Sequence, residues 1–364
     1  MSLDALRGFD MFCILGGEQI ITALAKGAPE GSWLHALRQQ LVHAEWAGFR
    51  FYDLIFPLFL FLIGVAVPLS IDKRLARGDS RARILQHAMI RFALMVFFGW
   101  WVHGNFLSWD ISKMQLSYSV LMMLGFGYLI AVTLVLFTSI RTQILATAAI
   151  LVAYWALQMF VPVPGQVPGE FTQGAILSDW LYDHSVGLLD APWKSQYGRG
   201  FELSLWTHGA TAMLGVFAAR ILKATWSNPE KMKWLIGLGL GCLVVGWLWS
   251  FNLPIVKRRW TSSYVLWAGG WSYLLMAAFY WIIEVKGLRR WAGLFVVIGS
   301  NSILAYLIAG VFMKPLRTLA EVLFGGLRIH VGEYWSGVWL ALATCGFAWL
   351  LLAYLHRRKV FLRL

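Results

Sequence analysis

The chain has 364 residues, of which 59% are hydrophobic and 13% are charged, and its mean hydropathy is +0.65. Soluble domains carry about twice that share of charged residues, so the composition excludes a soluble protein and indicates a polytopic membrane protein. The net charge of +13 lies in short basic clusters between apolar runs, which is typical of topology signals and argues against nucleic-acid binding.

Apolar runs of spanning length, roughly 17 to 25 residues, recur along the whole chain. Runs of this kind must be helices, because their backbone polar groups have to be bonded within the segment. We therefore predict an all-α fold with about ten transmembrane helices, forming a single domain over residues 1–364. The predicted spans are 8–25, 51–71, 84–103, 116–138, 142–161, 203–222, 233–251, 262–284, 291–313 and 335–355.

The distribution of basic residues predicts the topology. An even number of spans places both termini on one side, and Lys and Arg are more frequent in the loops on that side, most clearly at 73–83. The positive-inside rule then puts both termini in the cytoplasm. The start of the chain, MSLDALRGFDMF, is acidic where a cleavable signal peptide would be basic, so we expect the first span to direct insertion. The longest loop, about 162–202, is then extracytoplasmic.

The first predicted span contains several ionisable residues. Asp4 and Arg7 are three residues apart, at its inner edge and on one helical face. Asp10 and Glu18 are separated by a little over two helical turns, so both should face broadly the same way. Acidic groups on one face of a membrane helix should look into a cavity rather than into lipid. We expect Glu18 to be either protonated or partnered.

The stretch HAEWAGFRFYDLIFPLFLFLIG at 43–64 runs from a polar head into an apolar span. A titratable group at the mouth of a membrane helix, here His43, is a candidate functional residue. Asp53 lies at the start of the span, where the helix dipole favours a carboxylate. If the loop folds back, Asp53 can orient the imidazole and stabilise its charged form. The alternatives are a solvated interfacial histidine and an ordinary carboxylate at a helix start.

Polar residues recur near the later spans. Lys257, Arg258 and Trp260, at the outer end of the eighth span, could bind phosphate or carboxylate, or could anchor the helix at the interface. Asn301 in the ninth span needs a hydrogen-bond partner, either another helix or a polar ligand. The acidic residues of the 162–202 loop match no metal-ligand spacing, so we interpret the loop as solvated and predict no metal site. We interpret the histidines other than His43 as loop or interface residues.

Four ordered segments carry a resemblance: SLDALRGFDMF at 2–12, the stretch at 43–64, LPIVKRRWTSSYV at 253–265 and VKGLRRWAGLFVVIGSNSILAYL at 285–307. Together they resemble the heparan-α-glucosaminide N-acetyltransferase family and in particular its bacterial homologues. The resemblance implies an enzyme of the bacterial inner membrane that takes acetyl-CoA from the cytoplasm and passes the acetyl group to an amino sugar on the far side. Its implied partners are acetyl-CoA, the amino-sugar or glycan acceptor and membrane lipid, and it implies a homodimer.

The resemblance also implies residue roles. The family motif is H-x-x-W-x-G-x-x-x-x-D-L-x-F-P, and its histidine is catalytic. In this chain the motif histidine is His43 and the motif aspartate is Asp53. Glu18 is the third predicted catalytic residue, beside His43 and Asp53. It stands where the animal enzyme has an asparagine, so a carboxylate there could change acceptor preference. Cations on the inner side must hold the CoA phosphates, and Arg7 and the basic stretch 73–91 are candidates. The full set of predicted binding residues is Asp4, Arg7, Asp10, Trp46, Lys257, Arg258, Trp260, Asn301 and Ser302, of which the last two could line the pantetheine path.

The chemistry leaves two routes open. His43 could accept a proton from the amine as a general base, or it could attack the thioester itself and carry the acetyl group. We favour direct transfer, because the pantetheine arm is long enough to reach into the bilayer. The competing functions are O-acetylation of a periplasmic glycan, a proton-coupled sugar transporter and a structural scaffold. The absence of an internal repeat argues against a transporter, and the intramembrane carboxylates argue against a scaffold.

Overall fold

The computed structural model describes residues 1–103, 119–165, 167, 169–184 and 202–362. Within these ranges every regular element is a helix, which confirms the predicted all-α fold of a polytopic membrane protein. Eight helical segments of the described chain are long and apolar enough to cross a membrane. They are Ser2–Ala25, Phe51–Ala76, Arg81–Val102, Val120–Phe137, Ile140–Phe160, Asn228–Ser250, Ser262–Val285 and Ser302–Arg357.

Two of the ten predicted spans differ from this set. The predicted span 203–222 is a helix, α9 (Leu205–Lys223), but it is not among the eight apolar segments. The predicted span 291–313 is not one continuous helix, because it breaks between α12 (Ala292–Gly299) and α13 (Ser302–Leu307). The count of ten spans and the cytoplasmic termini therefore stay predictions.

The chain divides into two compact units. The first consists of Met1–His43, Arg50–Ile55 and Leu275–Leu364, and the second consists of Ala44–Phe49 and Phe56–Leu274. The polar stretch that begins at His43 thus contributes to both units.

The first unit begins with a close helix crossing. α1 (Ser2–Phe12) packs against α12, and two glycines lie at the contact. A Cβ atom at Gly8 would lie 1.7 Å from the Phe295 carbonyl oxygen, and one at Gly299 would lie 1.8 Å from the Asp4 carbonyl oxygen. Only glycine permits backbones this close, as in other membrane helix pairs with small residues at the contact.

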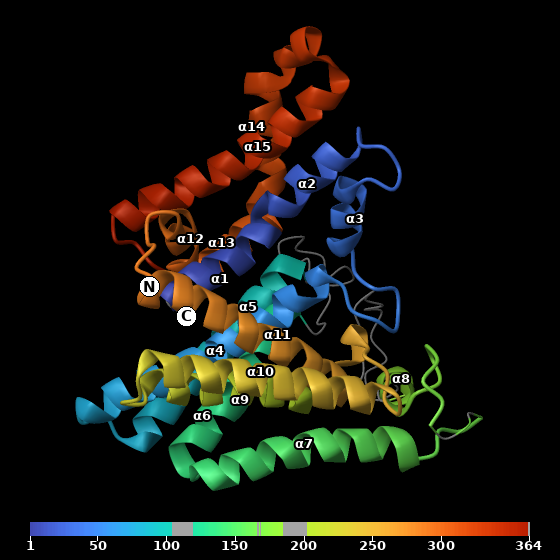
Figure 1. Ribbon diagram of the computed structural model, residues 1–364, viewed down its shortest axis with the longest axis vertical. Coiled ribbons are helices and arrows are strands. Elements are labelled where there is room, and N and C mark those ends of the chain that lie inside the picture. The colour runs from blue at the N-terminus through green and yellow to red at the C-terminus, as the bar shows by residue number, and fades with distance from the viewer. Residues whose placement is uncertain (104–118, 166, 168, 185–201, 363–364) are drawn as a thin grey trace. The chain divides into compact units, whose positions relative to one another are not determined.

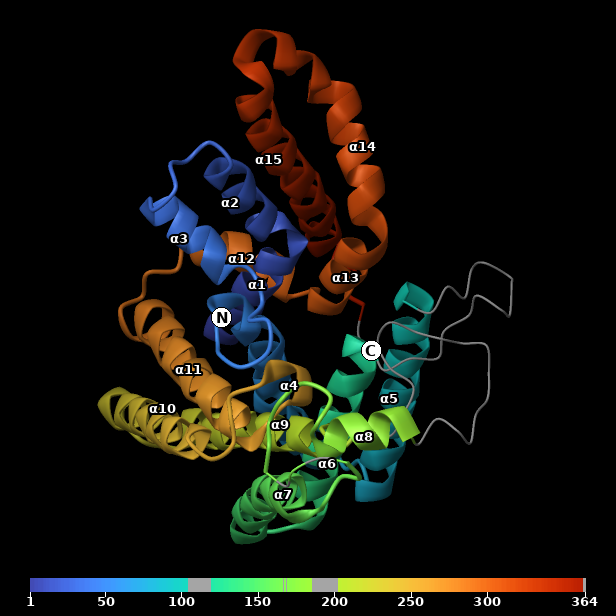
Figure 2. The same ribbon diagram turned by 90° about the vertical axis from the view of Figure 1, so that its right-hand side faces the viewer.

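The remaining helices of the first unit include a long hairpin. α14 (Met313–Phe324) and α15 (Arg328–Arg357) run side by side and are joined by a short 3₁₀ turn, Gly325–Leu327 (Figures 1 and 2). The shorter elements of the unit are a π-helix at Cys13–Gly17, α2 (Glu18–Ala25), α3 (Trp33–Gln40), a π-helix at Trp281–Val285 and a π-helix at Ile308–Phe312.

The second unit is built around α9, most of whose residues are buried. Its sequence GATAMLGVFAA is rich in small residues, which allows other helices to approach closely. The helices that contact α9 include α4 (Phe51–Ala76), α6 (Val120–Phe137), α7 (Ile140–Phe160), α10 (Asn228–Ser250) and α11 (Ser262–Tyr280), and a further long helix of the unit is α5 (Arg81–His103).

The interpretation of His208 as a loop or interface residue is wrong. His208 lies in α9 and is 1% exposed. Its Nδ1 atom is 2.6 Å from the Ser204 carbonyl oxygen, and its ring stacks on Trp260 with the ring centroids 4.0 Å apart. The small residues around it give α9 an interior position, which is why a histidine can be buried here.

The interpretation of the 162–202 loop as solvated is wrong for Asp179. This residue lies in α8 (Leu177–His184) and is 4% exposed. Its carboxylate pairs with the Arg259 guanidinium, which also lies 3.6 Å from the Glu202 carboxylate. Residues 166, 168 and 185–201 of the predicted loop lie outside the described residues.

Candidate active site

The centre of the candidate site is a contact between His43 and Asp53. His43 Nδ1 lies 2.8 Å from Asp53 Oδ1. The Asp53 side chain is fully buried, whereas the His43 side chain is 51% exposed. A buried carboxylate therefore orients the imidazole, while about half of the ring surface remains accessible. A histidine held in this way can take up a proton and have the resulting charge stabilised.

The start of α4 explains why Asp53 is placed there. The Arg50 backbone N–H donates to Asp53 Oδ2 at 3.0 Å, so this oxygen satisfies a backbone donor at the helix start. The Arg50 side chain donates from Nη1 to the His43 carbonyl oxygen at 3.3 Å. The Phe51 backbone N–H donates to Gln40 Oε1 at 3.1 Å. These bonds fold residues 40–53 back on themselves and bring His43 to the carboxylate.

A tyrosine connects this pair to Glu18. The rings of His43 and Tyr52 have their centroids 4.9 Å apart, at an angle of 45°. The Tyr52 hydroxyl lies near enough to the Glu18 carboxyl to interact with it electrostatically. Tyr52 therefore lies against the His43 ring and close to Glu18 at the start of α2.

Asp10 and Glu18 are separated by an irregular segment. The π-helix Cys13–Gly17 interrupts the first span, and Gly16 has a φ of 127°, a backbone conformation that favours glycine. The spacing rule of a regular helix therefore does not apply between the two carboxylates. π-Helical turns of this kind are frequent at functional sites.

The two carboxylates occupy different environments. Asp10 is fully buried, and within the described part of the chain neither of its carboxylate oxygens has a hydrogen-bond partner. Glu18 is half-buried and lines a cavity. The expectation that acidic groups of this span look into a cavity is met by Glu18, while Asp10 is not part of the cavity lining.

The cavity at Glu18 has a volume of about 760 Å³. It lies between α2, α14 and α15 of the first unit. Its size is within the usual range for small-molecule sites. Tyr334 closes one side, because its hydroxyl donates to the Leu24 carbonyl oxygen at 2.8 Å. The charged residues of its lining are Glu18, Lys26, Arg317, Arg328 and Glu333.

Other predicted residues of the first unit lie in structural contacts. Arg7 Nη1 is 3.3 Å from Asp4 Oδ1, in an ion pair within α1. The Asn301 amide donates from Nδ2 to the Val360 carbonyl oxygen at 3.0 Å and accepts the Leu362 backbone N–H at 3.0 Å. Asn301 therefore fastens the C-terminal segment at the break between α12 and α13. Its predicted role beside pantetheine, and that of the neighbouring Ser302, stay predictions.

The remaining predicted residues belong to the second unit. Trp46 donates from Nε1 to the Phe171 carbonyl oxygen at 2.8 Å. Trp260 is 3% exposed, has a φ of 48° and donates from Nε1 to Thr211 at 2.9 Å, so it is a packing residue. Lys257 and Arg258 lie on the 3₁₀ turn Lys257–Arg259.

Arg50 and Tyr52 are not among the residues predicted from the sequence, although both lie within the stretch at 43–64. Their roles depend on how the loop folds, which the spacing of the motif does not reveal. Their position in the sequence is the one signal that could have indicated them. Arg50 is the N-cap residue of α4 and Tyr52 lies in its first turn, so both are next to the candidate carboxylate Asp53.

Comparisons with known proteins confirm the predicted resemblance. Residues 1–165 match a family model described as a domain of unknown function, DUF5009. The chain is 28% identical to heparan-alpha-glucosaminide N-acetyltransferase of Mus musculus, over 72% of this chain and 48% of the mouse protein. It is 27% identical to the protein of the same name from Homo sapiens, over 88% of this chain and 55% of the human protein. The chain therefore spans about half the length of the curated relatives it matches.

Proposed function

We propose that this chain is a transmembrane acetyltransferase of a bacterial cytoplasmic membrane. It transfers the acetyl group of cytoplasmic acetyl-CoA to the amine of an amino sugar on the other side. The observation that carries the proposal is the contact between the accessible His43 ring and the buried Asp53 carboxylate. The distant similarity to two N-acetyltransferases supports the kind of reaction.

The His43–Asp53 pair suits the proton transfer that such a reaction requires. A sugar amine is protonated near neutral pH and must lose that proton before its nitrogen can attack a thioester. The amine nitrogen then bonds to the acetyl carbon, the carbon–sulfur bond breaks, and CoA leaves as a thiolate. The ammonium gives its first proton to solvent, and the nitrogen loses a second proton to His43 as it bonds to the acetyl carbon. His43 can return this second proton to the thiolate, and Asp53 stabilises the imidazolium in between.

Glu18 and its cavity suit the acceptor. A carboxylate at the wall of a polar cavity can pair with the ammonium group of an amino sugar before reaction. Tyr52, which interacts electrostatically with Glu18 and lies against the His43 ring, stands between the acceptor cavity and the general base. We therefore propose that Glu18 binds the amine and His43 deprotonates it.

The test uses the full chain, purified in detergent, with radiolabelled acetyl-CoA and glucosamine. His43→Ala should lower the rate of sugar acetylation by about 10²- to 10⁴-fold, the usual contribution of a general base. His35→Ala is the matched control, because His35 also lies in the first unit and no contact of its imidazole enters the mechanism. Equal activity in the parent and His43→Ala would contradict the role of His43.

The same assay, together with a flux measurement on the chain in liposomes, separates the competing functions. Labelled protein that accumulates without free product indicates an acetyl-histidine intermediate, and acetylation of a hydroxyl on a glycan acceptor indicates an O-acetyltransferase. Glucosamine flux into liposomes without acetyl-CoA would support a transporter and contradict the proposal.

A further inference from the structure

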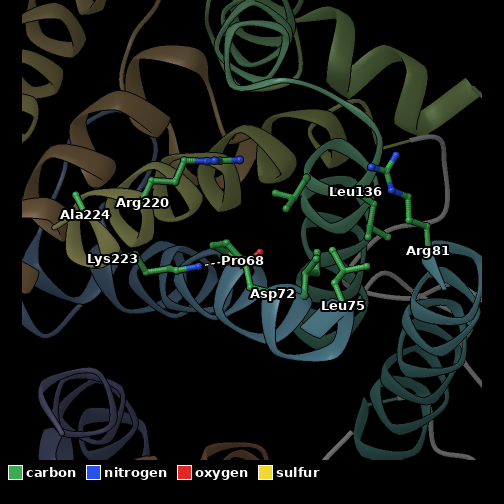
Figure 3. A pocket seen from close by; sticks show the side chains of 10 residues that line it. Pro68, Asp72, Leu75, Arg81, Leu136, Arg220, Lys223 and Ala224 are labelled. Atoms are coloured by element: carbon green, nitrogen blue, oxygen red, sulfur yellow. Dashed lines mark hydrogen bonds and ion pairs between the residues drawn. The ribbon is translucent and has the colours of Figure 1, made fainter. Parts of the chain in front are cut away.

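A second cavity, of about 340 Å³, lies in the second unit, and its lining shares no residue with the candidate active site (Figure 3). It forms where the C-terminal ends of α4, α6 and α9 meet the start of α5. Its lining residues are Pro68, Ile71, Asp72, Leu75, Arg81, Val135, Leu136, Arg220, Lys223 and Ala224.

Cations dominate this lining. It holds Arg81, Arg220 and Lys223 against a single carboxylate, Asp72. The Lys223 ammonium pairs with that carboxylate, as the dashed line in Figure 3 marks. The two guanidinium groups are thus in excess over the negative charge of the cavity.

A buried side chain outside the cavity lining fixes the position of one of these guanidinium groups. Arg220 donates from Nη2 to Gln143 Oε1 at 2.9 Å. Gln143 is itself fully buried, and its Nε2 donates to the carbonyl oxygens of Leu134 and Thr138 at 3.2 and 3.0 Å. A buried amide with fixed partners therefore orients the guanidinium at the cavity.

Helix electrostatics account for only part of this arrangement. Basic residues in the last turn of a helix are favoured by the helix dipole, which explains Arg220 and Lys223 at the end of α9. Arg81 is the first residue of α5, where the dipole disfavours a cation. An anion bound between the three side chains would offset that unfavourable position.

We propose that this cavity binds the phosphate groups of an organic phosphate, and that the ligand is the CoA part of the acyl donor. Guanidinium groups that line one cavity are frequent ligands of phosphate oxygens in proteins. Asp53 lies in the first turn of α4 and Asp72 near its end, so the cavity lies at the opposite end of that helix from the catalytic carboxylate. This assignment rests on the proposed function. The headgroup phosphate of an anionic lipid offers the same chemistry, and the experiment separates the two sources.

The experiment measures binding without turnover. The full chain is placed in phosphatidylcholine nanodiscs, and the dissociation constant of desulfo-CoA, which carries no thiol, is measured by titration calorimetry. Arg81→Gln should raise this constant about tenfold, because it removes a charge-assisted contact. Asp72→Asn should lower it about threefold, because it removes the negative charge of the cavity and releases Lys223. Lys233→Gln, an exposed cation on α10, is the matched control and should leave it unchanged.

The lipid is tested in the same variants with nanodiscs that contain phosphatidylglycerol. If Arg81→Gln lowers phosphatidylglycerol retention while desulfo-CoA binding is unchanged, the cavity is a phosphate site whose ligand is a lipid. If neither ligand responds to Arg81→Gln or Asp72→Asn, the inference is overturned. Because no turnover is measured, a chain that binds desulfo-CoA as expected but acetylates no sugar would contradict the proposed function and leave the phosphate site standing.

Discussion

At the residue scale, the two oxygens of Asp53 have separate tasks. Oδ2 accepts the Arg50 backbone N–H at the start of α4, and Oδ1 holds His43. The ordinary explanation of this residue, a carboxylate at a helix start, is therefore correct and compatible with the catalytic one. A substitution can separate the two tasks, because an amide oxygen can still accept the backbone bond but cannot stabilise an imidazolium by charge.

This separation predicts different outcomes for two variants. Asp53→Asn should lower kcat for sugar acetylation by at least about 10²-fold and change the melting temperature little. Asp53→Ala should show the same loss of kcat and also lose about 1 kcal/mol of stability, because the helix start loses its acceptor. Initial rates and thermal unfolding in one detergent check both. If both variants lose activity only in proportion to folded protein, Asp53 is structural.

At the element scale, a single arginine connects α8 to the start of α9. Arg259, on the 3₁₀ turn before α11, lies between the carboxylates of Asp179 and Glu202, and its own side chain is 18% exposed. The Tyr154 hydroxyl donates to the Arg259 carbonyl oxygen at 2.6 Å, which fixes the backbone of the turn to α7. Removing one partner of a buried ionic cluster is costly, because the other charges stay buried without compensation.

Arg259→Gln should therefore destabilise the chain by about 3–5 kcal/mol at neutral pH. Burial raises the pKa of Glu202, and the Arg259 charge partly opposes that rise. A carboxyl whose pKa is raised in the folded state favours folding below its unfolded pKa, and this contribution is lost as the pH rises through the folded pKa. The stability that Arg259→Gln loses relative to the parent should therefore become smaller as the pH falls from 7 toward 5. Thermal unfolding at several pH values checks this, with the exposed Arg258→Gln as control. A loss of stability that does not change with pH would contradict this prediction.

The same elements show what the sequence could predict. Hydropathy located the long apolar helices, because a membrane span must be both apolar and helical. It missed the break at Asn301, which depends on bonds to Val360 and Leu362 some sixty residues away. The motif at 43–64 located His43 and Asp53 because the carboxylate and the histidine are close in sequence. The link from Arg259 to Asp179 joins distant segments, so no local pattern could indicate it.

At the scale of the whole molecule, the proposed reaction requires a donor and an acceptor on opposite sides of the membrane. The predicted topology places the basic loop at 73–83 in the cytoplasm and the His43 end of α4 outside. The phosphate cavity includes Arg81 from that loop, which is where cytoplasmic acetyl-CoA would arrive. The two proposals together therefore require that the donor and the acceptor bind on opposite sides of the membrane. No experiment on a single residue tests this requirement.

Sealed vesicles of defined orientation test this property. In inside-out vesicles with glucosamine trapped in the lumen, acetyl-CoA added outside should yield acetylated sugar inside, because the cytoplasmic face is then exposed to the donor. Right-side-out vesicles given acetyl-CoA outside should yield none until they are permeabilised. Inside-out vesicles that carry His43→Ala should stay inactive, which excludes leakage followed by a soluble reaction. Product from intact right-side-out vesicles would invert the topology and place the His43 end of α4 in the cytoplasm.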